Sequence, residues 1–121
     1  MIVKLYRMKR LDINIPIYDQ NIIILKADSL STIDDYVEDC YRIQLEKGAV
    51  RSASTYILPD DIIIIGITPK VTDRIIVHET GHATFQLLKN IGINPIFDDE
   101  SFCYIQDYIF EKITVWHNKD D

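Results

Sequence analysis

The sequence predicts an α+β domain in which helices pack on a small mixed β-sheet. Short alternating or unbroken apolar segments indicate strands in the first two thirds of the chain, and helical spacing of apolar residues recurs in three longer segments. A chain of 121 residues suits one domain with a single core. We therefore expect one domain over residues 1–121, with its core in about residues 11–113 and a mobile tail at 114–121.

The first two strands are expected to form a hairpin. Residues 11–17, LDINIPI, alternate apolar and polar side chains, as a half-buried strand does. Pro16 has no N–H to donate, so this strand should lie at an edge of the sheet or end there. After the turn YDQ, residues 21–27, NIIILKA, are its expected partner.

The next segment, residues 31–48, has the spacing of an amphipathic helix. Ser31 is its expected N-cap, with Asp34 at the third position in a pattern close to a capping box. Ile33 and Val37 mark the apolar face, and Gly48 is expected to end the helix.

Two more strands are expected at residues 54–58 and 62–67, with a turn led by Pro59 between them. Residues 62–65 are four isoleucines without polar alternation. Such a strand is covered on both faces, so we expect it at the centre of the sheet.

Two helices complete the chain. Thr72 is the expected cap of the first, which should run to about Asn90 and stop at Gly92. The second is expected to begin near Asp98 or Asp99.

Charge and hydropathy argue against two classes of partner. The net charge of −6 repels a phosphate backbone, so we expect no nucleic-acid partner, and a local basic cluster is interpreted as a solvated strand face (Lys4, Arg7, Lys9 and Arg10). No apolar run approaches about 18 residues, so no membrane partner is expected. The N-terminal residues lack the apolar region of a signal peptide, which predicts a cytoplasmic protein.

The two cysteines, Cys40 and Cys103, each fall on an apolar helix face in this interpretation. In a reducing compartment they are expected to be buried thiols. There is no CxxC motif that would indicate a thiolate zinc site.

The most informative segment is HETGH, residues 78–82, within the helix expected after Thr72. His82 lies about 40° round the helix from His78, and both lie opposite the apolar stripe. Two imidazoles one turn apart can converge on one metal ion. Glu79, about 100° from His78, is too far round to bind in the same way, but it can take a proton from a metal-bound water. Gly81 marks either a close approach of another segment or simple tolerance.

A catalytic zinc site takes a third protein ligand. Our first candidate is Glu100, which heads the polar stripe of the last helix, and Asp99 is the next. Glu100 also suits a second role, as a first-turn acid that favours the helix dipole. His117 is expected to be a solvated residue of the tail.

Two further residues of the last helix have open roles. Tyr104, one turn after Glu100, is placed to hydrogen-bond a ligand or a developing oxyanion, although tyrosine is also common at helix edges. Asp107 is expected to be a solvated acid, and its alternative role is to orient a histidine.

HETGH together with DDESFCYIQDY resembles the gluzincin branch of the zincin metallopeptidases. The chain is most similar to the minimal zincin-like domains encoded by bacteriophages and mobile elements, over about residues 11–113. The resemblance implies zinc ligation by His78, His82 and Glu100, with Glu79 as general base. It departs from the family at Tyr104, where related proteins often carry an acid.

Our leading hypothesis is a zinc-dependent peptidase acting on a peptide or protein. An extended substrate is expected to pair with a sheet edge near residues 61–67. One alternative is a catalytically silent zinc-binding module that binds a protein partner. The other is a metal-free cleft that binds a peptide.

Overall fold

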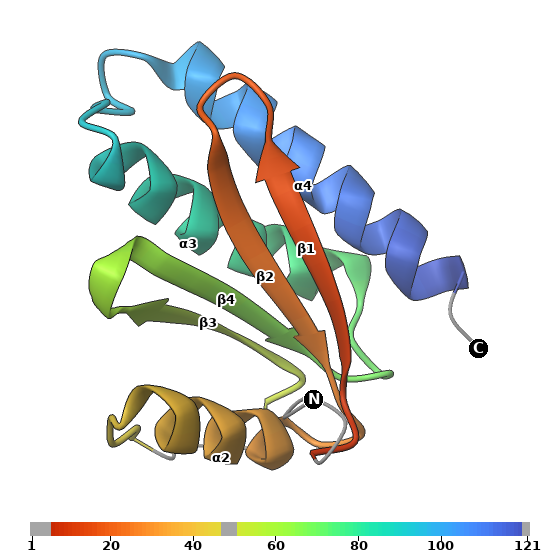
Figure 1. Cartoon of the computed structure of the whole chain (residues 1–121). Coiled ribbons are helices and arrows are strands. Elements are labelled where there is room, and N and C mark those ends of the chain that lie inside the picture. The colour runs from red at the N-terminus through yellow and green to blue at the C-terminus, as the bar shows by residue number, and fades with distance from the viewer. Residues whose placement is uncertain (1–5, 47–50, 120–121) are drawn as a thin grey trace.

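The computed structural model describes residues 6–46 and 51–119 and places three helices on the two faces of a four-stranded sheet. Helix α2 (Leu30–Tyr41) covers one face, and α3 (Asp73–Asn90) and α4 (Asp99–Lys119) cover the other (Figure 1). The α+β class predicted from the sequence is confirmed. No helix of the described residues is both long and apolar enough to cross a membrane.

The sheet is mixed and has the order β1-β2-β4-β3. Strands β1 (Lys9–Ile15) and β2 (Gln20–Lys26) form the predicted antiparallel hairpin, and β1 lies at an edge and ends just before Pro16. Strand β4 (Ile62–Ile67) is central, parallel to β2 and antiparallel to β3 (Ala53–Leu58). A short 3-10 helix at Pro59–Asp61 joins β3 to β4.

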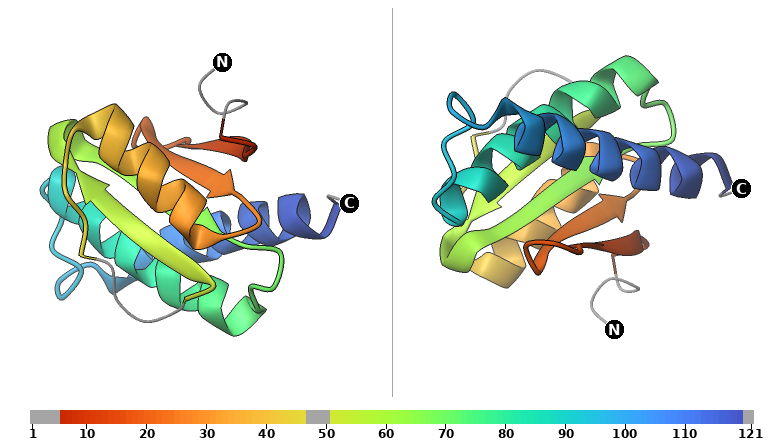
Figure 2. Two further views of the ribbon diagram at one scale, coloured as in Figure 1. Left: turned by 90° about the horizontal axis from the view of Figure 1, so that it is seen from below. Right: turned by 90° about the horizontal axis from the view of Figure 1, so that it is seen from above.

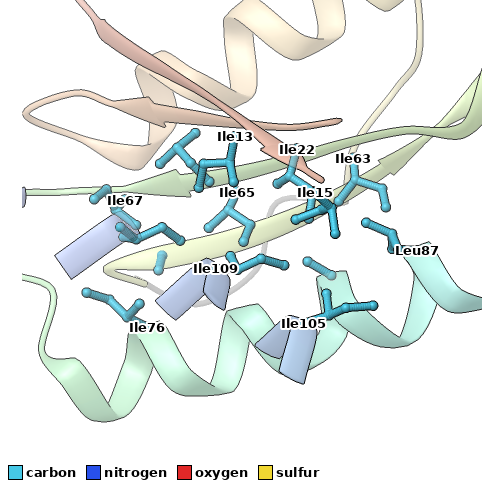
Figure 3. Packing of buried hydrophobic residues seen from close by; sticks show 14 of the residues in the cluster. Ile13, Ile15, Ile22, Ile63, Ile65, Ile67, Ile76, Leu87, Ile105 and Ile109 are labelled. Carbon is cyan, nitrogen blue, oxygen red and sulfur yellow. The ribbon is translucent and has the colours of Figure 1, made fainter. Parts of the chain in front are cut away.

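The unbroken apolar sequence of β4 is explained by cores on both faces of the sheet. Ile63, Ile65 and Ile67 point into the larger core beneath α3 and α4, shown in Figure 3. Ile64 points the other way, into the core beneath α2. The two views of Figure 2 show α2 on one face and the α3–α4 pair on the other.

Gly66 lets α2 approach the centre of the sheet. A Cβ atom there would lie 3.0 Å from a methyl group of Ile33 and 3.2 Å from the Tyr56 ring. Both neighbours are buried, so neither can move away freely. Gly66→Ala should therefore lower the free energy of unfolding by about 1–2 kcal/mol, measured by chemical denaturation.

Gly81→Ala is the matched control for that substitution. A Cβ atom at Gly81 would meet only the flexible end of Gln106, at 3.3 Å. The change also gains helix propensity of about 1 kcal/mol, so stability should stay equal or rise. A loss at Gly66 no larger than at Gly81 would contradict the packing explanation.

Helix α2 differs from its prediction at both ends. Its N-cap is Ser29 rather than Ser31, and no side chain caps it. The helix ends at Tyr41, where Arg42 takes a left-handed conformation, whereas the predicted end at Gly48 lies outside the described residues. Asp34 is not part of a capping box, because its carboxylate is buried against β3.

The boundaries of α3 agree with the sequence. Thr72 caps its N-terminus by accepting a hydrogen bond from the N–H of Ile75. At the other end, Gly92 has a φ of 81°, and the N–H of Ile93 donates to the carbonyl of Leu88 over 2.9 Å. A glycine after the last turn that carries these bonds is a common helix stop.

Helix α4 begins at Asp99 as predicted, but it is longer than expected. It continues to Lys119, so residues 114–119 are helical, and residues 120–121 lie outside the description. His117 therefore sits in the last turn of a helix and is half-buried, which corrects its placement in a solvated tail.

The prediction of buried thiols is wrong, since Cys40 and Cys103 are both exposed. Cys103 lies about 200° round α4 from Ile105, which is fully buried, so it faces away from the core. Cys40 lies in the last turn of α2, whose buried positions end at Val37.

Candidate metal centre

The histidines of HETGH lie together on the exposed side of α3. His78 and His82 are both exposed, as the helical angles predicted. Their Nε2 atoms are 3.1 Å apart, and their ring planes meet at 82°. The opposite side of the helix is buried in the larger core through Ile76, Ala83 and Leu87.

This separation fits two ligands of one metal ion. Two nitrogens at about 2.0–2.1 Å from zinc with tetrahedral geometry lie about 3.3 Å apart. The pair at 3.1 Å needs only a small adjustment to reach that spacing. The same distance fits a hydrogen bond between the N–H of one ring and the unprotonated nitrogen of the other, so the pair is compatible with two metal ligands.

Glu79 is more enclosed than the helical angles predicted. Its side chain is 9% exposed, because the flank of α3 on which it lies is covered by β3. The Thr55 hydroxyl donates to Glu79 Oε1 over 2.7 Å and lies 3.1 Å from the Glu79 carbonyl oxygen. The acid next to the histidines is therefore fixed against the sheet.

Gly81 faces α4. A Cβ atom at Gly81 would lie 3.3 Å from the amide nitrogen of Gln106, and that nitrogen donates to the carbonyl of Val77 over 3.3 Å. Helix α4 therefore runs alongside the helix that carries the histidines. Because only the flexible end of one side chain comes near, the contact does not require glycine, and of the two explanations offered the structure favours tolerance.

The candidate third ligands lie along that helix. Glu100 and Asp99 are exposed in the first turn of α4. Glu100 lines a shallow groove between α3 and α4 together with Val77, Tyr104 and Asp107. Within residues 6–46 and 51–119, no group of three His, Cys, Asp or Glu side chains converges, so the structure brings together the histidines but not Glu100 with them.

Tyr104 and Asp107, the other candidate residues of α4, are both exposed. Tyr104 is 46% exposed and stacks on Tyr108 with ring centroids 6.2 Å apart. Asp107 is exposed, as expected of a solvated acid. Asp98 receives hydrogen bonds from the hydroxyl and the backbone N–H of Ser101, which hold the pKa of Asp98 below its usual value.

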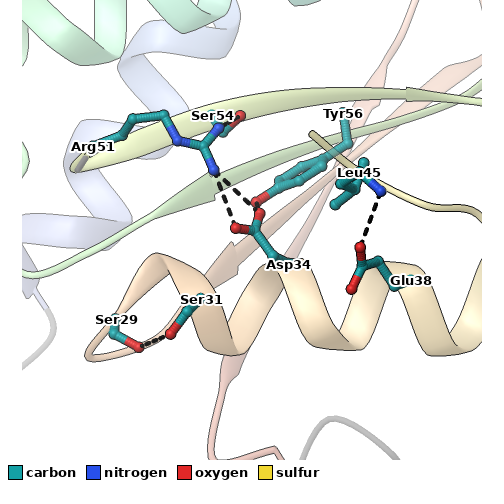
Figure 4. A network of polar contacts seen from close by, with 8 residues as sticks. All are labelled: Ser29, Ser31, Asp34, Glu38, Leu45, Arg51, Ser54 and Tyr56. Atoms are coloured by element: carbon teal, nitrogen blue, oxygen red, sulfur yellow. Dashed lines mark hydrogen bonds and ion pairs between the residues drawn. The ribbon is translucent and has the colours of Figure 1, made fainter. Parts of the chain in front are cut away.

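A polar cluster fastens β3 to α2 on the opposite face of the sheet (Figure 4). The Tyr56 hydroxyl donates to the buried carboxylate of Asp34 over 2.6 Å, and Arg51 forms an ion pair with the same carboxylate at 3.1 Å. Burial, followed by the hydrogen bond to Asp34, raises the pKa of Tyr56. Strand β3 is an edge strand, so this cluster stabilises a segment bonded to the sheet on one side only.

Sequence reasoning missed Thr55 and Gln106. Both act through partners far away in the sequence, and no spacing rule identifies such pairs. One signal pointed to Thr55. It lies on the same face of the strand as Ala53, which is buried in the larger core, so a hydroxyl there needs a partner.

Comparison with known protein families, with curated proteins and with solved structures finds no match for this chain.

Proposed function

We propose that this chain is a zinc-dependent peptidase with a zincin-like fold. The supporting observation is the pair of exposed imidazoles whose Nε2 atoms are 3.1 Å apart, with the enclosed carboxylate of Glu79 at the next position. A bound zinc ion polarises a carbonyl group and lowers the pKa of its water. Two ring nitrogens and a neighbouring acid would supply two of the three protein ligands of a catalytic zinc site and its general base.

Each residue of the proposed site has its own role. His78 and His82 would hold the metal through Nε2. Glu79 accepts a proton at Oε2, because Oε1 already takes the Thr55 hydroxyl, and passes it to the leaving amine. Glu100 is the proposed third ligand, and because it does not converge with the histidines, its carboxylate would have to approach them when metal binds.

The edge proposed for substrate pairing needs correction. Residues 62–67 form β4, which has β2 on one side and β3 on the other, so it has no free edge. Among the strands of residues 6–46 and 51–119, β3 is the outermost one on the side of α3, and we propose that substrate pairs with that strand. An extended peptide adds there as a fifth strand beside the site.

The register of β3 identifies the groups that would bind such a peptide. The N–H of Thr68 donates to the carbonyl of Ser52, which makes these two residues a hydrogen-bonded pair. Bonded pairs alternate along an antiparallel ladder. The backbone N–H and C=O groups of Thr55 and Ile57 therefore point away from β4, toward an added strand.

One observation favours a second function, a catalytically silent zinc-binding module. Only two donors converge in the described residues, and Glu79 is tied to the sheet. A site of this kind would hold zinc between this chain and a protein partner that supplies the remaining ligand. Peptide hydrolysis separates the two functions, since only the first includes turnover.

Zinc binding is the first test. Protein purified without a histidine tag should hold about one zinc per chain, and His82→Ala should weaken the affinity by more than about a hundredfold, measured by competition with a chelator. His117→Ala is the matched control, because it removes the one histidine outside the motif and should leave affinity unchanged.

The same assay locates the third ligand. Glu100→Ala should weaken zinc binding, while Asp99→Ala should not. Equal affinity in the wild-type protein and in Glu100→Ala would remove Glu100 from the site. A wild-type protein that binds no added zinc would contradict both the peptidase and the silent module.

A further inference from the structure

We propose that Thr55 is a positioning residue, which holds the carboxylate of Glu79 in the orientation needed to accept a proton. The inference rests on the proposed function, because it concerns the residue proposed as base. The observation behind it is the hydrogen bond from Thr55 on β3 to Glu79 on α3. That contact can be tested by itself.

The contact is specific to one residue of the motif. The Thr55 hydroxyl is 2.7 Å from Glu79 Oε1 and 3.1 Å from the carbonyl oxygen of the same residue. A single hydroxyl thus contacts both the side chain and the backbone of Glu79. A hydrogen bond to a carboxylate is among the stronger ones, and at a 9% exposed site it limits the conformations open to that side chain.

Thr55 can fix the position of Glu79 only if strand β3 is itself fixed in place. Tyr56, the next residue, points to the opposite face, where its hydroxyl donates to Asp34 on α2 over 2.6 Å. Arg51 binds the same carboxylate and also donates to Ser54 over 2.8 Å (Figure 4). The edge strand is thus attached to a helix on each face, through adjacent residues.

The arrangement has a chemical consequence. With Oε1 bound to Thr55, the remaining oxygen, Oε2, is the one presented for proton transfer. Without the hydroxyl, the carboxylate can rotate, and fewer molecules hold it in the reactive orientation at any moment. A small misplacement of a catalytic group is enough to lower a rate substantially.

The first experiment is a double-mutant cycle on unfolding of the full, metal-free chain. Thr55→Val keeps the shape and strand propensity of the side chain and removes the hydroxyl. Combined with Glu79→Ala, it should show a coupling of about tenfold in the unfolding equilibrium constant. Ser54→Ala, the neighbouring change on the opposite face, should show no coupling with Glu79→Ala. Additive effects of Thr55→Val and Glu79→Ala would overturn the proposed contact.

The second experiment measures catalysis with zinc bound. Thr55→Val should lower kcat by about 10- to 100-fold with KM and zinc affinity unchanged, and Thr55→Ser should restore kcat. An unchanged kcat in Thr55→Val would overturn the positioning role, whereas a protein that cleaves no peptide would overturn the proposed function. If the protein cleaves no peptide but the metal-free cycle still shows coupling, the contact between Thr55 and Glu79 stands and only the proposed function fails.

Discussion

Replacing Glu79 by glutamine should lower kcat for peptide hydrolysis by about 10²–10⁴-fold while zinc remains bound. Glutamine has nearly the same shape and can still accept the Thr55 hydrogen bond, so the fold and the two histidines should be undisturbed. What it lacks is a carboxylate oxygen that can take up a proton. The expected result is thus a protein that binds substrate and metal but turns over very slowly.

Steady-state kinetics and metal analysis of the same preparation test this prediction. Gln106→Ala is a suitable control, because Gln106 also contacts α3 beside the motif, through the carbonyl of Val77, but has no proposed chemical role. It should leave kcat within a few-fold of the wild-type value. Full activity in Glu79→Gln would show that Glu79 is not the base, and zinc binding without hydrolysis in the wild-type protein would favour the silent module.

Local sequence patterns predicted the elements whose residues depend mainly on their immediate neighbours. The four isoleucines of residues 62–65 require cover on both faces, and β4 has it. Thr72 and Gly92 mark the ends of α3 because a cap and a left-handed glycine act within one helical turn. The exposure of His78 and His82 was predicted from their angular positions on the helix, opposite the apolar stripe.

The end of α2 and the exposure of the cysteines were not predictable in this way. Apolar spacing continues past Tyr41, but Arg42 adopts a φ of 55° and ends the helix. Burial of a cysteine depends on whether another element covers its position. Cys103 lies on the side of α4 turned away from the sheet, so its apolar character does not bury it.

The residues that surround the site could not be predicted, because they depend on the order of strands in the sheet. The sequence places residues 62–67 just before the motif helix, and that proximity suggested them as a substrate edge. In the structure β3 lies outside β4, so it covers β4's edge and supplies the hydroxyl that binds Glu79. Pairing between strands is a long-range property, and residues 53–58 alone do not indicate which side of the sheet they will occupy.

The largest loss of stability is expected from Asp34→Ala. Asp34 is 5% exposed and binds both the Tyr56 hydroxyl and the Arg51 guanidinium. Its removal leaves the buried Tyr56 hydroxyl without its acceptor and takes one of two polar partners from the exposed Arg51, which should cost about 2–3 kcal/mol of unfolding free energy. Chemical denaturation measures this loss, and Asp35→Ala, an exposed neighbour on α2, should cost less than about 1 kcal/mol.

Alkaline pH probes the same cluster without removing Asp34. The folded protein raises the pKa of Tyr56 above its ordinary value near 10, chiefly by burial and then by the hydrogen bond to Asp34. This contribution to stability is complete below pH 10 and declines above it, because the unfolded chain then releases a proton that the folded chain retains. Tyr56→Phe should therefore show a weaker decline in unfolding free energy between about pH 10 and 11 than the wild-type protein. Equal declines would show that Tyr56 ionises normally, and the attachment of β3 to α2 would then have to rest on Arg51 and on apolar packing.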